Sequence, residues 1–223
     1  MLGAVIGDIA GSRFEFDNYR HTDFDIFSPD SDFTDDTICT VAIADWVLQG
    51  CNDNLASILQ GWCRAYPYPK GAYGGRFSQW IEWKDPEPYN SWGNGSAMRV
   101  SAVGWAFATL EETLHFAEQS AIVTHNHPEG IKGAQAVAAA IFWARTGISK
   151  VQIRENITRQ FGYDLSQSCD QIRPHYHFNE SCQKTVPQAI TAFLESDDFE
   201  PAIRLAVSLG GDRASLAAIA GSL

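Results

Sequence analysis

Two adjacent carboxylates are the first feature of this sequence that could do chemistry. Asp35 and Asp36 follow Thr34 in the run FTDDT at residues 33–37. One interpretation is structural, because a threonine N-cap followed by acidic residues is typical of a helix start. The other is functional: adjacent carboxylates repel one another, and a hard cation bound by oxygen ligands would relieve the repulsion. Oxygen ligands suit Mg²⁺, Mn²⁺ or Ca²⁺ better than zinc.

Four further motifs combine glycine with polar residues near expected helix ends. They are GDIAGSRFE at 7–15, GNGSAMR at 93–99, THNHPEG at 124–130 and GGDRAS at 210–215. Two glycines in the first helix cost about 1 kcal/mol each relative to alanine, which makes sense if another backbone packs close by. Glycines and a hydroxyl before a helix expose N–H groups that suit a phosphate. Each motif also has a structural interpretation as a turn, a cap or a hydrogen-bonded histidine.

Acidic charge is concentrated around the paired carboxylates. The chain has 223 residues and a net charge of −11, from 16 Lys and Arg against 27 Asp and Glu. No Lys or Arg lies between Arg20 and Arg64, a stretch that holds eight Asp residues: Asp23, Asp25, Asp30, Asp32, Asp35, Asp36, Asp45 and Asp53. This distribution argues against a basic nucleic-acid binder. It predicts either a solvated acidic face or a surface that binds something positive.

Composition predicts a folded protein of the cytoplasm. Hydrophobic residues make up 45% and charged residues 19%, which excludes a disordered chain. The N-terminus lacks the basic region of a signal peptide, and no stretch approaches the roughly 18 apolar residues of a membrane span. The five cysteines are odd in number and lack CxxC spacing, so we expect reduced thiols. The HxH pairs at 125–127 and 175–177 lack further ligands at fixed spacing, which disfavours zinc.

Helical periodicity dominates the chain and positions the motifs at helix ends. The expected helices span residues 2–12, 35–49, 54–65, 95–109, 111–124, 129–146, 149–161, 187–195, 198–209 and 212–222, with a short helix at 77–83. Pro187 is expected as the first residue of its helix. Residues 66–93 are rich in Gly, Pro and aromatic side chains and are expected to form a long loop. The sequence therefore predicts an all-α fold, with function carried by the long loops.

Together the motifs resemble the ADP-ribosylglycohydrolase family, which includes the dinitrogenase-reductase-activating glycohydrolases. The matching runs are GAVIGDIAGSRFE at 3–15, FTDDT at 33–37, GNGSAMR at 93–99, TH at 124–125 with Gly130 and Gly133-Ala134 following, and GGD with AAIAG at 210–221. They come in the family's order and reach from one end of the chain to the other. The resemblance implies a single all-α orthogonal bundle over residues 1–223. It also implies a hydrolase that removes ADP-ribose from a modified protein side chain or a related ADP-ribosyl conjugate.

The resemblance further implies a site with two Mg²⁺ or Mn²⁺ ions. It assigns metal ligation to Thr34, Asp35, Asp36, Asp212 and Ser215. Glu15 matches the acidic residue implicated in hydrolysis in some members, and Glu15, Asp35 or Asp36 would accept the proton of the attacking water. The implied substrate-binding residues are Gly74, Gly75, Gly93, Asn94, Gly95, Ser96 and His125. Tyr73, Phe77, Tyr89 and Trp92 are candidates for stacking on adenine.

Two departures from the family pattern open an alternative function. Ala214 stands where the family usually carries a second Asp, and Arg213 adds a positive charge beside it. The chain also ends soon after this motif, where family members usually continue through another helix. We therefore expect one metal site to be weakened. The alternative is an ADP-ribose-binding module of weakened activity.

A third hypothesis, independent of the resemblance, is a phosphoester hydrolase with paired metals. The chain has no GxxxxGK[ST] loop, which removes nucleoside triphosphatases of that kind. The acceptor group of the ADP-ribosyl substrate stays open. We expect a monomer.

Overall fold

All the regular elements of the described chain are helices, in agreement with the sequence prediction. The computed structural model describes residues 1–14, 17 and 19–223. Its helices are α1 (Leu2–Ser12), α2 (Asp35–Leu48), α3 (Leu55–Ala65), α4 (Gly75–Glu82), α5 (Gly95–Met98), α6 (Ser101–Ala106), α7 (Leu110–Ile122), α8 (Pro128–Arg145), α9 (Lys150–Phe161), α10 (Cys169–Ile172), α11 (Cys182–Glu195), α12 (Phe199–Ser208) and α13 (Arg213–Ser222). Two isolated bridges, Thr34 with Lys70 and Gly93 with Ser181, tie loops together.

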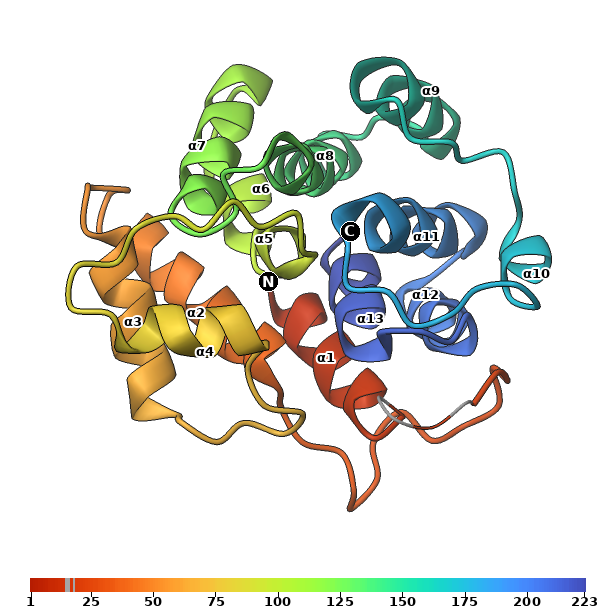
Figure 1. Cartoon of the computed structure of the whole chain (residues 1–223). Coiled ribbons are helices and arrows are strands. Elements are labelled where there is room, and N and C mark those ends of the chain that lie inside the picture. Colours follow the sequence, from red (N-terminus) through yellow and green to blue (C-terminus); the bar gives the residue numbers. More distant parts are fainter. Residues whose placement is uncertain (15–16, 18) are drawn as a thin grey trace.

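The first and last helices pack against each other at the centre of the molecule (Figure 1). Their backbones approach so closely that a Cβ added at Gly7 would lie 2.1 Å from the carbonyl oxygen of Ala217. A Cβ added at Gly221 would lie 2.3 Å from the carbonyl oxygen of Gly3. The expected close packing against the first helix is therefore confirmed, and α13 is the partner.

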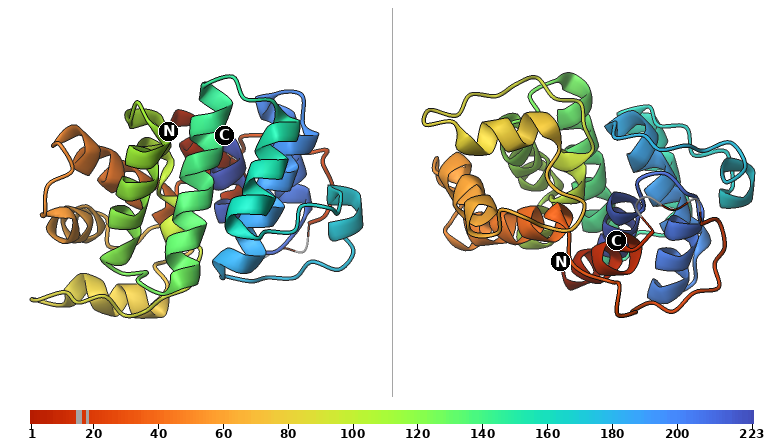
Figure 2. Two further views of the ribbon diagram at one scale, coloured as in Figure 1. Left: turned by 90° about the horizontal axis from the view of Figure 1, so that it is seen from above. Right: turned by 60° about the horizontal axis from the view of Figure 1, so that its bottom comes forward.

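The remaining helices surround this central pair. In Figure 1, α2, α3 and α4 lie on one side of it and α10, α11 and α12 on the other. The long helix α8 contacts α6, α7, α9 and α11, and Figure 2 shows it running between α7 and α9. Residues Ala138, Ala139 and Ala140 of α8 are fully buried, so their small side chains let neighbouring helices approach.

Two of the expected helices differ clearly from the sequence prediction. The helix expected over 95–109 is two short helices, α5 and α6, separated at Arg99 and Val100. The side chain of Arg99 is fully buried there and reaches α7, so tertiary contacts replace a continuous helix. Helix α11 begins at Cys182, which places Pro187 inside the helix. The buried side chains of Cys182 and Val186 explain why packing favours this earlier start despite the proline.

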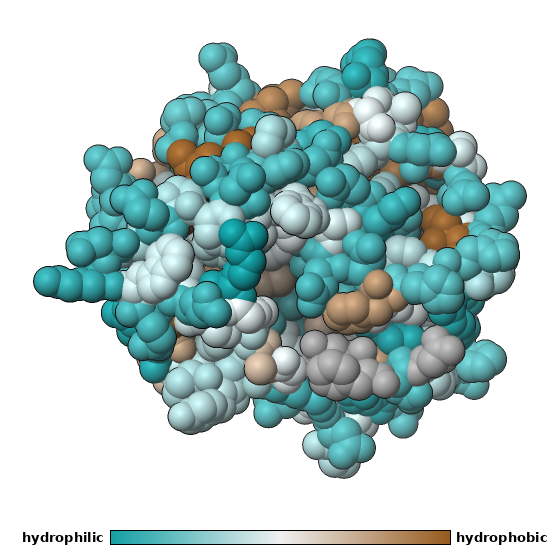
Figure 3. All heavy atoms as spheres, in the orientation of Figure 1, coloured by the Kyte–Doolittle hydropathy of each residue, from teal (hydrophilic) through white to brown (hydrophobic). Residues whose placement is uncertain are grey.

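One face of the molecule is mostly hydrophilic (Figure 3). Figure 3 shows hydrophilic residues over most of one face, with apolar patches that are small and separate. Among the described residues, no helix is long and apolar enough to cross a membrane. All five cysteines are free of disulfide bonds.

Candidate active site

Helix starts from distant parts of the sequence meet through a set of polar side chains. Thr34 is the N-cap of α2 and Asp212 is the N-cap of α13. The hydroxyl of Ser215 donates to Asp36 Oδ2 at 3.4 Å, which joins α13 to α2. Asn94 Nδ2 donates to Asp212 Oδ2 at 2.8 Å, which joins the turn before α5 to α13. The structure therefore brings together residues that are more than a hundred positions apart in the sequence.

Asp8 is a central residue that sequence reasoning missed. It is fully buried on α1, and its carboxylate accepts hydrogen bonds from the backbone N–H and the hydroxyl of Thr34, at 2.9 and 2.7 Å. It also accepts from the backbone and the hydroxyl of Thr37, at 3.1 and 2.5 Å. Burial raises the pKa of Asp8, and these hydrogen bonds oppose the rise. The available signal was a charged residue on an otherwise apolar helix, which is rarely buried without partners.

Asp36 is the most strongly perturbed carboxyl of this region. It is 3% exposed, and its Oδ1 has no hydrogen-bond partner among the described residues. Burial raises the pKa of Asp36 well above its usual value, and the charges of Asp8, Asp35 and Asp212 raise it further. We call these four residues, Asp8, Asp35, Asp36 and Asp212, the acidic cluster. An ionised Asp36 is thus poorly compensated by the protein alone.

Asp212, the N-cap of α13, is the member of the acidic cluster that comes from the end of the chain. Burial raises the pKa of its carboxyl, while the hydrogen bonds from Asn94 and Ser215 oppose the rise. Asp212 is partly buried, as is Asp35. The predicted ligands Thr34, Asp36, Asp212 and Ser215 are therefore linked by contacts, and Asp35 belongs to the same electrostatic group.

The donor set fits a hard divalent cation. Carboxylate and hydroxyl oxygens are the ligands that Mg²⁺ prefers, and the unpartnered Asp36 Oδ1 is an oxygen that a cation would satisfy. In the described part of the chain, no three His, Cys, Asp or Glu side chains are arranged as a ready metal cage. A bound ion would therefore need hydroxyl or water oxygens as additional ligands.

Ala214 and Arg213, at the start of α13, have different consequences. Ala214 is 2% exposed and supplies no ligand at the position where the family pattern has a carboxylate. Arg213 is also buried, but its guanidinium donates to the carbonyl oxygens of Phe14 at 2.9 Å and Tyr19 at 2.8 Å. The Arg213 guanidinium is therefore engaged by the backbone at Phe14 and Tyr19. The predicted catalytic residue Glu15 lies outside the described residues.

The glycine-rich turn before α5 lies against His125. A Cβ added at Gly93 or Gly95 would lie 3.4 or 3.1 Å from His125 Nε2. Ser96 is fully buried, and its hydroxyl donates to the carbonyl oxygen of Gly130 at 2.7 Å. The predicted substrate-binding residues 93–96 and His125 are thus brought together, with the Ser96 hydroxyl already engaged.

The loop at residues 66–93 borders the same region. Its residue Lys70 forms the bridge with Thr34, next to the acidic cluster. Gly74 and Gly75 are exposed at the start of α4, and a Cβ added at either would meet nothing within 4 Å. The ring of Tyr89 lies 6.1 Å from that of His125 between centroids.

A second residue that the sequence did not reveal is Tyr176. It comes from the irregular segment between α10 and α11, and its ring covers Gly211, where an added Cβ would lie 2.4 Å from Cε1. The hydroxyl is buried. Burial and the charge of Asp212 raise the pKa of Tyr176. Tyr176 therefore closes the side of the site next to α13.

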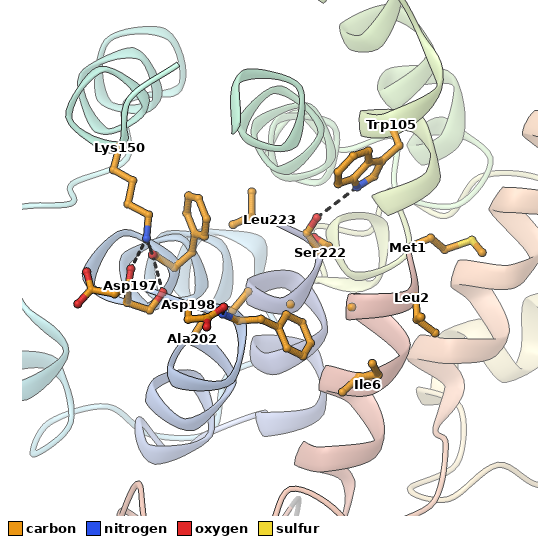
Figure 4. Close-up of a pocket in the computed structure, with 16 residues that line it drawn as sticks. Met1, Leu2, Ile6, Trp105, Lys150, Asp197, Asp198, Ala202, Ser222 and Leu223 are labelled. Carbon is orange, nitrogen blue, oxygen red and sulfur yellow. Dashed lines mark hydrogen bonds between the residues drawn. The ribbon is translucent and has the colours of Figure 1, made fainter. Parts of the chain in front are cut away.

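A cavity of about 510 Å³ lies away from these residues. It is lined by both ends of the chain and by Trp105, Lys150 and Phe199 (Figure 4). The indole N–H of Trp105 donates to the carbonyl oxygen of Ser222 at 3.4 Å. None of the predicted site residues lines this cavity, so it is separate from the candidate active site.

Known proteins resemble this chain over its whole length. The sequence model of the ADP-ribosylglycohydrolase family matches residues 1–223. An uncharacterized protein of Archaeoglobus fulgidus is 28% identical over 260 residues, covering 100% of this chain and 84% of that protein. ADP-ribosylarginine hydrolase Tri1 of Pseudomonas putida is 27% identical over 256 residues, covering 100% of this chain and 68% of that enzyme.

A solved structure and a vertebrate enzyme extend the comparison. The structure of an ADP-ribosylglycohydrolase-related protein complex matches with a TM-score of 0.74 and 25% identity, covering 100% of this chain and 83% of that one. ADP-ribosylhydrolase ARH3 of Xenopus tropicalis is 26% identical over 173 residues, covering 66% of this chain and 49% of that enzyme.

Proposed function

Because the chain belongs to the ADP-ribosylglycohydrolase family, we propose that it is a magnesium-dependent hydrolase that removes ADP-ribose from a modified protein side chain or a related conjugate. The family consists of hydrolases that act on ADP-ribosyl bonds, and Tri1 is described as an ADP-ribosylarginine hydrolase. The single observation that carries the proposal is the buried, unpartnered Asp36 Oδ1 beside three further carboxylates.

The residues proposed to hold the metal are Thr34, Asp35, Asp36, Asp212 and Ser215. When bound, Mg²⁺ would neutralise the acidic cluster and lower the pKa of a bound water. The hydrogen bonds that Asp8 accepts from Thr34 and Thr37 fix the start of α2, so the paired carboxylates are presented in one orientation. Asn94 performs the same positioning for Asp212.

Hydrolysis needs a group that accepts a proton from the attacking water and residues that hold the ribose in place. The bond between ribose C1″ and the acceptor group would break through an oxocarbenium-like transition state, with a water oxygen adding at C1″. A carboxylate of the pair Asp35 and Asp36 accepts the water's proton in this proposal, and Glu15 is the other candidate; the proton then passes to the departing nitrogen or oxygen of the acceptor, which leaves neutral. The turn at residues 93–96 and His125 bind the ADP-ribosyl group, whose diphosphate supplies binding energy that fixes the sugar.

One observation favours the alternative, an ADP-ribose-binding module of weakened activity. Ala214 is buried and offers no oxygen ligand, so three carboxylates, Asp35, Asp36 and Asp212, stand against two divalent ions. The alternative predicts binding of ADP-ribose without turnover.

Release of ADP-ribose from defined substrates separates the two functions. Peptides carrying ADP-ribosyl-arginine or ADP-ribosyl-serine are incubated with the protein, with Mg²⁺ or with a chelator, and free ADP-ribose is measured. Magnesium-dependent release from either substrate supports the hydrolase. No release, together with ADP-ribose binding by calorimetry, supports the binding module. The variant Asp53→Asn removes one exposed carboxylate from the same acidic stretch. It serves as a control and should release ADP-ribose as the wild type does.

A further inference from the structure

Arg99 is buried without an acidic partner. Its side chain is 1% exposed, and no ion pair of the described residues includes it. Nη2 donates to the carbonyl oxygen of Ser120 at 2.8 Å and to Thr124 Oγ1 at 2.9 Å, while Nε has no partner among the described residues. A buried guanidinium without a carboxylate is costly. Apolar side chains could join the surrounding helices equally well. Packing alone therefore does not explain why a charged guanidinium is buried here.

The hydrogen bonds of Arg99 continue to a histidine. Thr124 is fully buried, and its Oγ1 lies 2.7 Å from His125 Nδ1. A threonine hydroxyl has one proton to donate and two lone pairs to accept. Arg99 occupies one lone pair, and Nδ1 is the acceptor that the structure gives for the hydroxyl proton. If Nδ1 carried a proton instead, the hydroxyl proton would be buried without an acceptor, at a cost of about 1–3 kcal/mol.

This network leaves the other ring nitrogen as a donor. With Nδ1 accepting, the neutral imidazole carries its proton on Nε2. Nε2 is the atom that faces Gly93, in the turn before α5, and Gly95, the first residue of α5, where added Cβ atoms would lie 3.4 and 3.1 Å away. Among the described residues no side chain or carbonyl accepts a hydrogen bond from Nε2. The donor therefore points at the turn that the proposed function assigns to the ADP-ribosyl group.

We propose that Arg99 and Thr124 are positioning residues that fix His125 as the neutral Nε2–H tautomer, which donates to an acceptor oxygen of the bound ADP-ribosyl ligand. The ligand half of this inference rests on the proposed function, whereas the tautomer does not.

The charges around His125 agree with a neutral ring. Burial lowers the pKa of His125 well below its usual value, and the nearby charge of Arg99 lowers it further. Tyr89 packs against the same ring, and burial raises its pKa to about 12, so it stays uncharged. Protonation of His125 is thus opposed at neutral pH, and a single donor at Nε2 is maintained.

Nitrogen NMR of the histidine ring tests the tautomer without any ligand. In ¹⁵N-labelled protein, His125 should show an unprotonated Nδ1 and a protonated Nε2. Thr124→Val removes the hydroxyl at nearly constant volume, and the ring should become a mixture of tautomers. Thr124→Ser keeps the hydroxyl and should keep the wild-type signature. A protonated Nδ1 in the wild type, or an unchanged signature in Thr124→Val, would overturn the proposal.

Two substitutions of Arg99 test its role in fixing the tautomer of His125. Arg99→Lys keeps the charge and a donor, so the Nε2–H form should persist. Arg99→Met frees the carbonyl oxygen of Ser120 as an alternative acceptor for the Thr124 hydroxyl proton, so the ring should become a mixture of tautomers. Should Arg99→Met fail to fold, as judged by circular dichroism, loss of the tautomer in folded Arg99→Lys would contradict the role assigned to Arg99.

ADP-ribose binding then tests the ligand half. Titration calorimetry should give a Kd about three- to tenfold weaker for Thr124→Val than for the wild type, and close to wild type for Thr124→Ser. Equal affinity in both variants would refute the donor role. If the wild type binds no ADP-ribose, the proposed function fails while the NMR result still decides the tautomer.

Discussion

Replacing Asp36 by asparagine should abolish the stabilisation of the protein by Mg²⁺ while leaving the metal-free fold intact. The Asp36 carboxylate is 3% exposed, its Oδ1 is unpartnered, and neighbouring carboxylates raise its pKa. The asparagine side chain would keep an oxygen to accept from Thr34 and Ser215, and the substitution removes a charge that burial penalises. Without metal, Asp36→Asn should therefore be at least as stable as the wild type.

Magnesium should reverse that order. A ligand present at a hundred times its Kd stabilises the folded state by about 2.7 kcal/mol. For a chain of this size, about 1 kcal/mol corresponds to roughly 2–4 °C in Tm. Saturating Mg²⁺ should thus raise the wild-type Tm by about 5–10 °C and leave Asp36→Asn within about 1 °C.

Thermal unfolding followed by circular dichroism, with Mg²⁺ or with EDTA, measures both effects. Asp53→Asn is the control for charge removal in the same acidic stretch, and it should respond to Mg²⁺ as the wild type does. Equal magnesium shifts in Asp36→Asn and the wild type would refute the assignment of Asp36 as a ligand. A large loss of stability in EDTA would refute the claim that its charge is uncompensated.

Three further predictions follow from the packing and the charges. Gly7→Ala should lower the free energy of unfolding, measured by chemical denaturation, by about 1–3 kcal/mol or more, because the added Cβ meets the backbone of Ala217. Gly61→Ala adds its Cβ in open space in α3 and should raise the same free energy by up to about 1 kcal/mol. In EDTA, the raised pKa of Asp36 means that its carboxyl binds a proton more tightly in the folded than in the unfolded state, so the stability of the wild type relative to Asp36→Asn should fall as the pH rises above about 4, the ordinary pKa of Asp. A wild type that gains stability relative to Asp36→Asn over that rise, in chemical denaturation, would contradict this sign. Ala214→Asp should destabilise the protein in EDTA, because it places a charge at a position that is 2% exposed. The same variant should show a larger increase in Tm with Mg²⁺ than the wild type. An unchanged increase would show that position 214 does not face the metal site.

The fold was largely predictable because its signals are local and repeated. Apolar periodicity identified most of the helices, and the glycines of α1 correctly indicated a close backbone, which is that of α13. The break between α5 and α6 and the early start of α11 could not be predicted, since buried side chains such as Arg99 and Val186 decide them through contacts distant in sequence.

The candidate site was predictable only where a motif carried it. The contacts among Thr34, Asp36 and Ser215 agree with the motif spacing. Asp8 and Tyr176 were missed because their roles depend on which residues the fold brings beside them. The hydrogen bond from the Arg213 guanidinium to the carbonyl oxygen of Phe14 could not be predicted from the sequence either.

We propose that this chain hydrolyses ADP-ribosyl bonds with the help of Mg²⁺ and Asp36. The most direct measurement is the rate of ADP-ribose release from ADP-ribosyl-arginine and ADP-ribosyl-serine peptides, with wild type and Asp36→Asn compared in Mg²⁺ and in EDTA. We expect release by the wild type in Mg²⁺, and release at least a hundredfold slower (about 2.7 kcal/mol in barrier) in EDTA or with Asp36→Asn. Release that is equal in EDTA, or equal in Asp36→Asn, would contradict it.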